Sequence, residues 1–205
     1  MLAMKLYWFW SFNPQKVRLA LNELGIAHEI VKVDLFRREQ QQPEFLKLNP
    51  AGKVPVLEDD GMVLAESNAI LVYLGEKTGR LWPADPGHRG AALRWLFYEA
   101  RHVSDPLGAC WFYDYVAPKV RIPVDEAARS RADEQLPGIL GLVETQLGAN
   151  RWLLGEDFSL VDCCYGAAFD ALSRSRFSLA DFPAICGFIE RMRERPAWSR
   201  CEFRG

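Results

Sequence analysis

The sequence lacks the motifs that mark the common cofactor-binding proteins. It holds no Gly-x-Gly-x-x-Gly fingerprint, no Walker-type phosphate loop and no Cys-x-x-Cys pair. Its three histidines, His28, His88 and His102, show no spacing typical of metal ligands. These absences argue against a dinucleotide or nucleoside triphosphate site, and we expect no bound metal.

Cysteine, charge and long apolar runs are also limited. The five cysteines are odd in number and lie in the second half of the chain, which fits a reducing compartment better than a disulfide framework. The formal net charge of -2 gives no basic footprint for nucleic acid. No run approaches the roughly 18 apolar residues of a membrane helix, and the first residues lack a signal-peptide pattern. We expect a cytoplasmic protein that spans no membrane.

The first half of the chain alternates strand and helix patterns. Its periodicity predicts strands at 4–9 and 29–33, a hairpin around the turn at 59–61, and helices at 14–25 and 66–79. The order βαβ followed by ββα implies one parallel strand pair and one antiparallel hairpin. We therefore predict a compact α/β sheet domain covered by helices.

The second half has helical patterns throughout. Residues 80–90 contain two prolines and two glycines, and we place a linker at 81–88. The pattern beyond it predicts two long helices, at 88–116 and 125–148. We expect Pro106 to kink the first of these and Pro137 to disturb the second. The helical pattern of the second half therefore predicts an all-α bundle.

One helix start in this bundle carries a local stability signal. Ser159 and Asp162 have the Ser-x-x-Asp spacing of a capping box, and Phe158 can act as its hydrophobic staple. A cap contributes about 1 kcal/mol to stability. We therefore expect Asp162→Ala to harm folding before it harms function.

Two stretches indicate a family. "PEFLKLNPAGKVPVLEDDGMVLAESNAILVYL" (43–74) closely resembles the glutathione-binding half of cytosolic glutathione transferases, and "LLGEDFSLVDCC" (153–164) resembles the capped helix of their C-terminal domain. The resemblance spans nearly the whole chain and is greatest to bacterial, Ser-type, theta- or nu-like members. It implies a thioredoxin-like domain at 1–80, an all-helical domain at 89–205, and glutathione as co-substrate with no metal.

The same resemblance assigns residues for glutathione. In the family, the residue before a cis-proline pairs its backbone with the cysteinyl unit of the peptide, and Val54-Pro55 matches this turn. Glu66 and Ser67 match residues that hold the γ-glutamyl end at a helix N-terminus, where unpaired N–H groups favour a carboxylate. An alternative is that Ser67 only caps its own helix.

The glycyl end of the peptide is assigned with less detail. Lys53 matches a position near the glycyl carboxylate, although an exposed lysine can equally be a solvated charge. Gln40 matches a polar contact at the same end. It lies in the run "RREQQQ", so Gln41 and Gln42 are rivals for this contact.

The family's thiol-activating residue lies just after the first strand, where the first helix begins. Ser11 occupies the place expected in Ser-type classes. Asn13, followed by Pro14, is typical of a helix N-cap, but it also resembles the second residue of a Ser/Thr-x-Asn pattern used by some bacterial classes. Tyr7 is a weaker rival because it falls within the strand. Ser11 is therefore the first candidate and Asn13 the second, and the sequence does not settle between them.

The chemical requirement explains why a polar donor belongs at this position. A free thiol titrates near 8.5, and lowering its pKa by about 2 units requires roughly 2.7 kcal/mol of preferential thiolate stabilisation. A hydrogen bond to a charged group contributes about 1.5–3 kcal/mol, and a helix N-terminus adds about 0.3–1 kcal/mol. The Ser11 hydroxyl at a helix start therefore supplies an effect of the required size.

The second substrate is expected to be a small hydrophobic electrophile bound between the domains. The candidate pocket residues are Phe12, His102, Trp111 and Phe112, each of which could instead belong to the core. The predicted activity is conjugation of the glutathione thiolate to this electrophile. A glutathione-dependent disulfide reductase or peroxidase and a non-catalytic binding protein are the alternatives.

The family resemblance also implies a homodimer. Helices in the ranges 66–77 and 88–116 are where such proteins usually pair. Tyr73 falls in the first of these ranges, so it belongs either to that interface or to the core.

Overall fold

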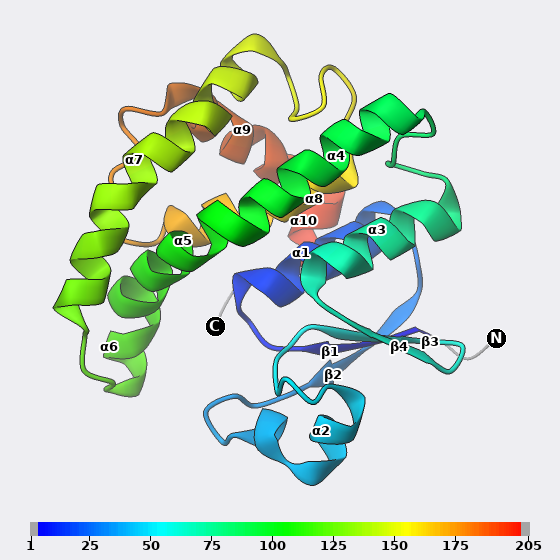
Figure 1. The fold of residues 1–205 in the computed structure, drawn as a ribbon. Coiled ribbons are helices and arrows are strands. Elements are labelled where there is room, and N and C mark those ends of the chain that lie inside the picture. The colour runs from blue at the N-terminus through cyan, green and yellow to red at the C-terminus, as the bar shows by residue number, and fades with distance from the viewer. Residues whose placement is uncertain (1–3, 202–205) are drawn as a thin grey trace.

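The computed structural model describes residues 4–201 (Figure 1). The strands are β1 (Met4–Trp8), β2 (His28–Lys32), β3 (Val56–Asp59) and β4 (Met62–Ala65). The helical elements of the first half are α1 (Phe12–Glu23), the short turn η1 (Glu39–Gln41), α2 (Pro43–Leu48) and α3 (Ser67–Thr78). Those of the second half are α4 (Pro86–Tyr98), η2 (Glu99–Val103), α5 (Ser104–Trp111), η3 (Phe112–Val116), α6 (Ala117–Val120), α7 (Glu126–Ala149), α8 (Leu160–Leu172), α9 (Pro183–Arg193) and α10 (Pro196–Ser199).

The four strands form one mixed sheet in the order β2-β1-β3-β4. β1 runs parallel to β2, with Leu6 opposite Ile30, and antiparallel to β3, with Leu6 opposite Leu57. β3 and β4 form a hairpin in which Gly61 has a φ of 84°, a value that glycine adopts without strain. The predicted thioredoxin-like order of βαβ followed by ββα is thus confirmed.

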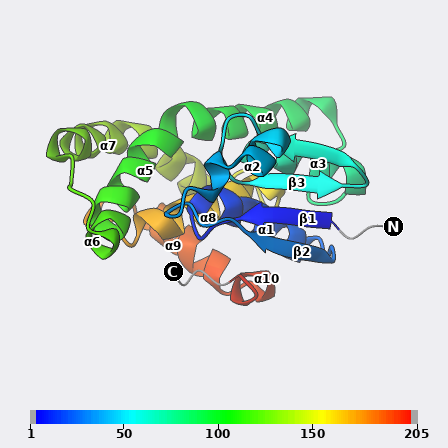
Figure 2. The same cartoon turned by 90° about the horizontal axis from the view of Figure 1, so that it is seen from below.

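Helices cover both faces of the sheet. α1 and α3 lie between the sheet and the helical half, whereas α2 lies on the far side of the sheet (Figures 1 and 2). Leu6 and Leu57 are fully buried in the main core, and a smaller cluster of Val33, Phe45 and Val56 packs separately. The starts of α1 and α3 therefore meet the helical half directly.

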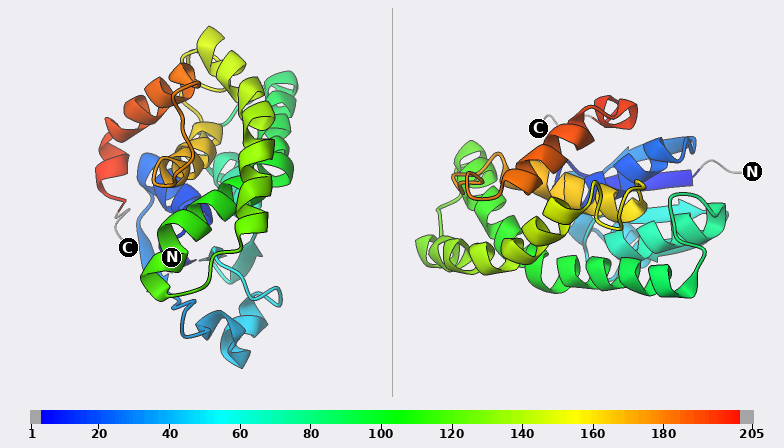
Figure 3. Two further views of the ribbon diagram at one scale, coloured as in Figure 1. Left: turned by 90° about the vertical axis from the view of Figure 1, so that its left-hand side faces the viewer. Right: turned by 90° about the horizontal axis from the view of Figure 1, so that it is seen from above.

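The helical half is built around α8, every residue of which is buried. α8 contacts α1, α3, α4 and α9, and Figure 3 shows it inside the bundle between α9 and α4. One continuous apolar core joins strand β1 through α1 and α8 to the end of α9. Among the described residues, no helix combines the length and apolar character needed to cross a membrane.

The helix predicted over 88–116 differs from expectation at Pro106. The chain passes from α4 into the π-helical turn η2, then α5, then a second π-helical turn η3. Proline lacks an N–H group and its ring crowds the carbonyl one turn earlier, and a preceding π turn relieves that crowding. The irregularities therefore flank Pro106 on both sides instead of forming one kink at it.

The disturbance predicted at Pro137 does not appear, because α7 runs continuously through it. Leu136 and Leu140 are fully buried on either side of the proline. Their packing holds the helix together across the missing hydrogen bond, since tertiary burial supplies most helical stability in proteins.

The capping box predicted at the start of α8 is confirmed. The carboxylate of Asp162 accepts hydrogen bonds from the Ser159 N–H and the Ser159 hydroxyl, both at 2.8 Å, and from the Leu153 N–H at 2.9 Å. Burial raises the pKa of Asp162 to about 6, although these three hydrogen bonds oppose the rise. The residue ties the loop before α8 to the helix itself.

Candidate functional site

A cavity of about 260 Å³ lies where the sheet domain meets the helical half. It is bounded by the first turns of α1 and α3, by the turn before β3, and by the region where η2 passes into α5. Its lining residues are Asn13, Lys16, Asn49, Lys53, Val54, Pro55, Glu66, Ser67, Asn68, Glu99, Ala100, Ser104 and Asp105. Of the six residues predicted to bind glutathione, five line this cavity, and Gln40 does not.

The turn before β3 presents backbone groups to the cavity. The Val54-Pro55 peptide bond is cis, as the family resemblance implies. Asn49, which is buried, donates from Nδ2 to the Lys53 carbonyl at 2.8 Å and accepts from the Ala51 N–H at 3.1 Å. Neither the N–H nor the C=O of Val54 has a hydrogen-bond partner among residues 4–201. The turn therefore offers a free donor and acceptor pair that resembles an open strand edge.

The start of α3 forms a second wall. Glu66 is the N-cap of the helix, and Ser67 is its first residue, so Ser67 does not cap its own helix. The Glu66 side chain makes no capping hydrogen bond either, which leaves the first N–H groups of α3 available at the cavity. Glu66 has a φ of 67°, a conformation that is strained for a residue other than glycine.

The start of α1 separates the two candidates for thiol activation. α1 begins at Phe12 with Ser11 as its N-cap, so Asn13 is not the cap that its Pro14 neighbour suggests. Asn13 lines the cavity, and its Oδ1 accepts from the Ser67 hydroxyl at 3.5 Å. That contact leaves the Nδ2 donors of Asn13 available. Within the described residues, Ser11 makes no side-chain capping bond, and it lines a different hollow.

A buried ion pair forms the back of the cavity. The Lys16 ammonium lies 2.7 Å from a Glu99 carboxylate oxygen, and both side chains are 1% exposed. Burial acts to lower the pKa of Lys16, but the neighbouring Cys164 and Glu99 raise it, so the lysine stays charged. Asn68 donates from Nδ2 to the other Glu99 oxygen at 3.0 Å and to the Leu96 carbonyl at 2.8 Å. This network joins α1, α3 and the π turn η2.

The hollow beside Ser11 is lined mainly by aromatic and charged side chains. It measures about 20 Å³ and is bounded by Trp10, Ser11, Phe12, Gln15, Trp111, Tyr115, Ala167, Asp170, Ala171 and Arg174. The ring of Trp111 makes edge contacts with Trp10 at 5.7 Å and with Phe12 at 6.0 Å between centroids. Phe12 and Trp111, both predicted for the electrophile pocket, are thus brought together here.

Several predicted residues lie elsewhere. His102 is exposed and contacts the Tyr98 ring, and Phe112 contacts Tyr113, so neither lines the cavity or the hollow. Gln40 also lies outside both, with a buried Oε1 atom that has no partner among the described residues.

Two residues are rivals of Gln40 for the glycyl end of the peptide. Gln41 donates from Nε2 to the Gly52 carbonyl at 3.5 Å, and Gln42 is exposed at the start of α2. Tyr7 donates its hydroxyl to Glu58 at 3.1 Å, and Tyr73 donates to Asp59 at 2.5 Å. Both tyrosines are therefore occupied away from the cavity.

The structure adds residues that the sequence patterns did not single out. They are Lys16, Asn49, Asn68 and Glu99 at the cavity and Trp10, Tyr115 and Arg174 at the hollow. Lys16 lies three residues after Asn13 and thus on the same face of α1, a spacing that could have indicated it. The second-half residues reach these sites through helix packing, which no local pattern encodes.

Comparison with known proteins agrees with this geometry. The glutathione S-transferase N-terminal domain matches residues 2–76, and the glutathione S-transferase C-terminal domain matches residues 94–196. The disulfide-bond oxidoreductase YfcG of Escherichia coli is 34% identical over 199 residues, which cover 94% of this chain and 91% of YfcG. Glutathione S-transferase 3 of Zea mays is 34% identical over 210 residues, covering 98% and 93%. A glutathione transferase of Burkholderia graminis, solved with two glutathione molecules bound per subunit, has a TM-score of 0.86 at 29% identity, covering 97% of this chain and 86% of that one.

Proposed function

This chain belongs to the glutathione S-transferase family, and from that premise we propose that it conjugates glutathione to small hydrophobic electrophiles. Glutathione occupies the cavity beside Asn13 in this proposal. The electrophile approaches over the aromatic side chains of Phe12 and Trp111 beside the α1 start.

The observation that carries the proposal is the convergence of three unpaired backbone features on one cavity. The cis turn at Val54 offers a free N–H and C=O, and α1 and α3 both begin there without side-chain caps. A peptide backbone suits the first feature, and the carboxylate of a γ-glutamyl group suits the start of α3. Lys53, exposed at the cavity rim, supplies a cation for the second carboxylate of the tripeptide.

We assign the role of thiolate donor to Asn13 ahead of Ser11. Asn13 lines the cavity and keeps its Nδ2 donors available, whereas Ser11 lines the neighbouring hollow. Donation from an amide to a sulfur anion supplies a stabilisation of about 1.5–3 kcal/mol, and the helix start adds about 0.3–1 kcal/mol. The thiolate then attacks the electrophilic carbon, a carbon–sulfur bond forms, and the leaving group departs with its electron pair.

A second candidate function is reduction of disulfides by glutathione. It is supported by the similarity to YfcG, which is named a disulfide-bond oxidoreductase. In this reaction the thiolate attacks one sulfur of the disulfide and releases the other as a thiolate. The thiolate of a second glutathione then attacks the glutathione sulfur of the mixed disulfide, which forms glutathione disulfide and releases the other substrate sulfur as a thiolate. The same donor at Asn13 serves both reactions.

Parallel assays on one preparation of protein test these proposals. We expect calorimetry to show glutathione binding, and we expect turnover of 1-chloro-2,4-dinitrobenzene to exceed turnover of hydroxyethyl disulfide, each corrected for the uncatalysed rate. A reversed preference would favour the reductase. Glutathione binding without any turnover would favour a non-catalytic binding protein.

We also propose that the protein is cytoplasmic, because all five cysteines are free, as a reducing compartment would keep them.

We further propose a homodimer. Phe97 on α4 is 71% exposed, which is unusual for so large an apolar side chain. The dimer buries the face of α4 that carries Phe97. Sedimentation equilibrium should give a dimer for the wild type and a monomer for Phe97→Asp, and a monomeric wild type would contradict the proposal.

A further inference from the structure

A buried pair of opposite charges at the back of the cavity has no part in the binding of the peptide described above. Lys16 of α1 and Glu99 of η2 are each 1% exposed and lie 2.7 Å apart, and both line the cavity. Taking two charges out of water is costly, and apolar side chains can often replace such a pair without loss of stability. Stability alone therefore does not account for two charges at this place.

The two charges of the pair face different walls of the cavity. Lys16 lies one turn after Asn13 on α1, and its ammonium lies 5.4 Å from the centroid of the Phe12 ring. The carboxylate of Glu99 extends toward α3, because its second oxygen accepts from Asn68 Nδ2 at 3.0 Å. The positive end of the pair therefore lies toward the start of α1, which is where the proposed function places the sulfur of glutathione.

The other charges of the cavity do not favour an anion beside α1. In the described part of the chain, the charged side chains that line the cavity are three carboxylates and two ammonium groups: Glu66, Glu99, Asp105, Lys16 and Lys53. The proposed function assigns Lys53 to the second carboxylate of the tripeptide. Among these side chains, Lys16 is therefore the cation that remains for the thiolate.

Neighbouring side chains fix the pair in place. Asn68 donates to the Leu96 carbonyl at 2.8 Å as well as to Glu99, and its Oδ1 accepts from the Cys164 thiol at 3.3 Å. Glu99 and Cys164 are the titratable groups that face Lys16, from η2 and α8. A charge that is held in position with little water around it stabilises an anion without reorganisation. The ammonium can therefore act on the sulfur through space.

We propose that Lys16 and Glu99 set the electrostatic potential at the sulfur of bound glutathione, with the ammonium stabilising the thiolate and the carboxylate limiting that effect. The inference rests on the proposed function, because it places the sulfur beside Asn13. When the bound thiol ionises, its S–H bond breaks, the proton passes to water and the electron pair stays on the sulfur. Asn13 then donates a hydrogen bond to the thiolate, and the ion pair adds an effect that needs no contact.

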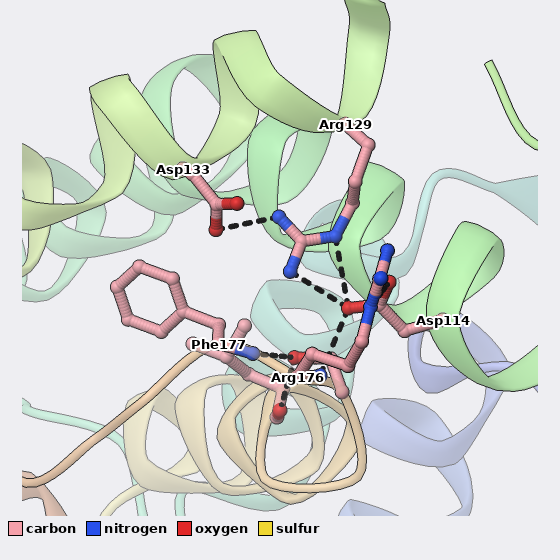
Figure 4. Close-up of polar contacts among 7 residues, drawn as sticks. Asp114, Arg129, Asp133, Arg176 and Phe177 are labelled. Atoms are coloured by element: carbon pink, nitrogen blue, oxygen red, sulfur yellow. Dashed lines mark hydrogen bonds and ion pairs between the residues drawn. The ribbon is translucent and has the colours of Figure 1, made fainter. Parts of the chain in front are cut away.

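A second buried ion cluster provides a matched comparison. The Arg129 side chain of α7 is 4% exposed and lies 2.7 Å from the carboxylate of Asp114 in η3, which is 1% exposed. Figure 4 shows Asp114 between Arg129 and Arg176, which belongs to the loop after α8. None of these three residues lines the cavity. Removing a charge from this cluster disturbs a buried pair and leaves the charge of the cavity unchanged.

Three variants test the inference by ultraviolet titration of the thiolate of bound glutathione. Glu99→Gln leaves the Lys16 ammonium uncompensated, so the thiol pKa should fall by about 1 unit, as a unit charge about 10 Å away produces at an effective dielectric constant of about 20. Lys16→Met leaves the Glu99 carboxylate uncompensated, so the thiol pKa should rise by about 1 unit. The double variant Lys16→Met/Glu99→Gln should give a smaller rise, because the ammonium it loses lies nearer the sulfur than the carboxylate does.

Opposite shifts separate this role from a structural one. Each single variant leaves a buried charge without its partner, so a loss of packing would move the thiol pKa in the same direction in both. If Lys16→Met does not fold, the wild type, Glu99→Gln and the double variant still give the predicted order. Arg129→Met and Asp114→Asn are the controls, and both should keep the wild-type thiol pKa even where they lose stability.

The outcomes distinguish the inference from the proposed function. Any other order of the thiol pKa values, or equal shifts in the controls, overturns the inference even if the wild type conjugates glutathione. The predicted order in a protein that forms no thioether supports the inference and contradicts the proposed conjugation. A wild type that does not bind glutathione in calorimetry contradicts both.

Discussion

The cavity at the sheet and the hollow at the helices both adjoin the first turn of α1, and they are built in different ways. The cavity presents backbone groups: a cis turn at Val54 and the uncapped starts of two helices. The hollow is built from side chains, with Trp10 and Trp111 as walls and Arg174 at one end. A site made of backbone suits a constant peptide, whereas a site made of side chains can vary with the second substrate.

The largest expected effect concerns Lys16, which belongs to the ion pair at the back of the cavity. Lys16→Met leaves the buried Glu99 carboxylate without its cation, and loss of one partner of a buried pair costs about 3–5 kcal/mol. Urea denaturation should show this loss of unfolding free energy. The double variant Lys16→Met/Glu99→Gln should recover much of it, because the introduced amide is neutral and its oxygen can still accept from Asn68. If the single and double variants are equally unstable, the unpaired Glu99 charge is not the cause of the instability.

A smaller loss of stability should follow from a change confined to the helical half. Asp162→Ala leaves the N–H groups of Leu153 and Ser159 and one hydroxyl without an acceptor, at a cost of about 3 kcal/mol. Asp157→Ala removes an exposed carboxylate from the same loop and serves as the control. Equal melting temperatures for the wild type and Asp162→Ala would refute the role of the capping box.

The same carboxylate predicts a pH dependence. Burial raises the pKa of Asp162 to about 6, whereas an aspartate in an unfolded chain titrates near 3.9. The folded state therefore holds this proton more tightly, so the contribution of Asp162 to stability falls as the pH rises from about 4 to about 6. The wild type should lose unfolding free energy relative to Asp162→Asn across that range. A difference that is constant with pH would show that burial does not perturb the group.

In the cavity, changing a single side chain should alter the affinity for glutathione more than it alters the unfolding free energy. Ser67→Ala removes one hydroxyl at the start of α3, so we expect glutathione to bind about tenfold more weakly, with unfolding free energy nearly unchanged. Calorimetry measures the affinity, and Ser130→Ala on the exposed face of α7 is the control. Wild-type affinity in Ser67→Ala would remove the residue from the binding site.

The smallest effect should come from the strained residue of the cavity. Glu66→Gly relieves a φ of 67° and should raise the unfolding free energy by at most about 1 kcal/mol, offset in part by the entropy of the unfolded glycine. The same change should weaken glutathione binding, because it removes a side chain that lines the cavity. A variant that is both less stable and equally able to bind glutathione would contradict the idea that strain is retained here for function.

The two regions also differ in how far the sequence predicts them. The helix start near Ser67 follows from a short local pattern, and the cis turn at Val54 follows from the resemblance of residues 43–74 to a known family. The thioredoxin-like domain and most of the cavity could therefore be anticipated. Lys16 and Glu99 could not be paired in advance, because they are far apart in the sequence and meet only when η2 packs against α1. Residue type alone favours His102 and Phe112 for the electrophile pocket, and the π turns direct them elsewhere. A change in helical register moves every side chain that follows, and residue pattern does not report it.

The choice between Asn13 and Ser11 also depends on a detail of helix geometry that the residue pattern does not report. Both residues precede the predicted helix, and only the observed start at Phe12 places Asn13 inside the first turn, on the cavity face. A shift of two residues in a helix boundary lies within the ordinary uncertainty of pattern-based prediction. In our proposal, this shift decides which side chain donates to the sulfur.

An ultraviolet titration of the thiolate of bound glutathione tests the central claim most directly. The account predicts that wild-type protein lowers the thiol pKa well below its ordinary value, that Asn13→Ala raises it by about 1 unit or more, and that Ser11→Ala raises it less, since a hydrogen bond to an anion contributes about 1.5–3 kcal/mol. Asn13→Ala with a wild-type titration curve would contradict the account, because the sulfur would then be ionised by some other part of the protein.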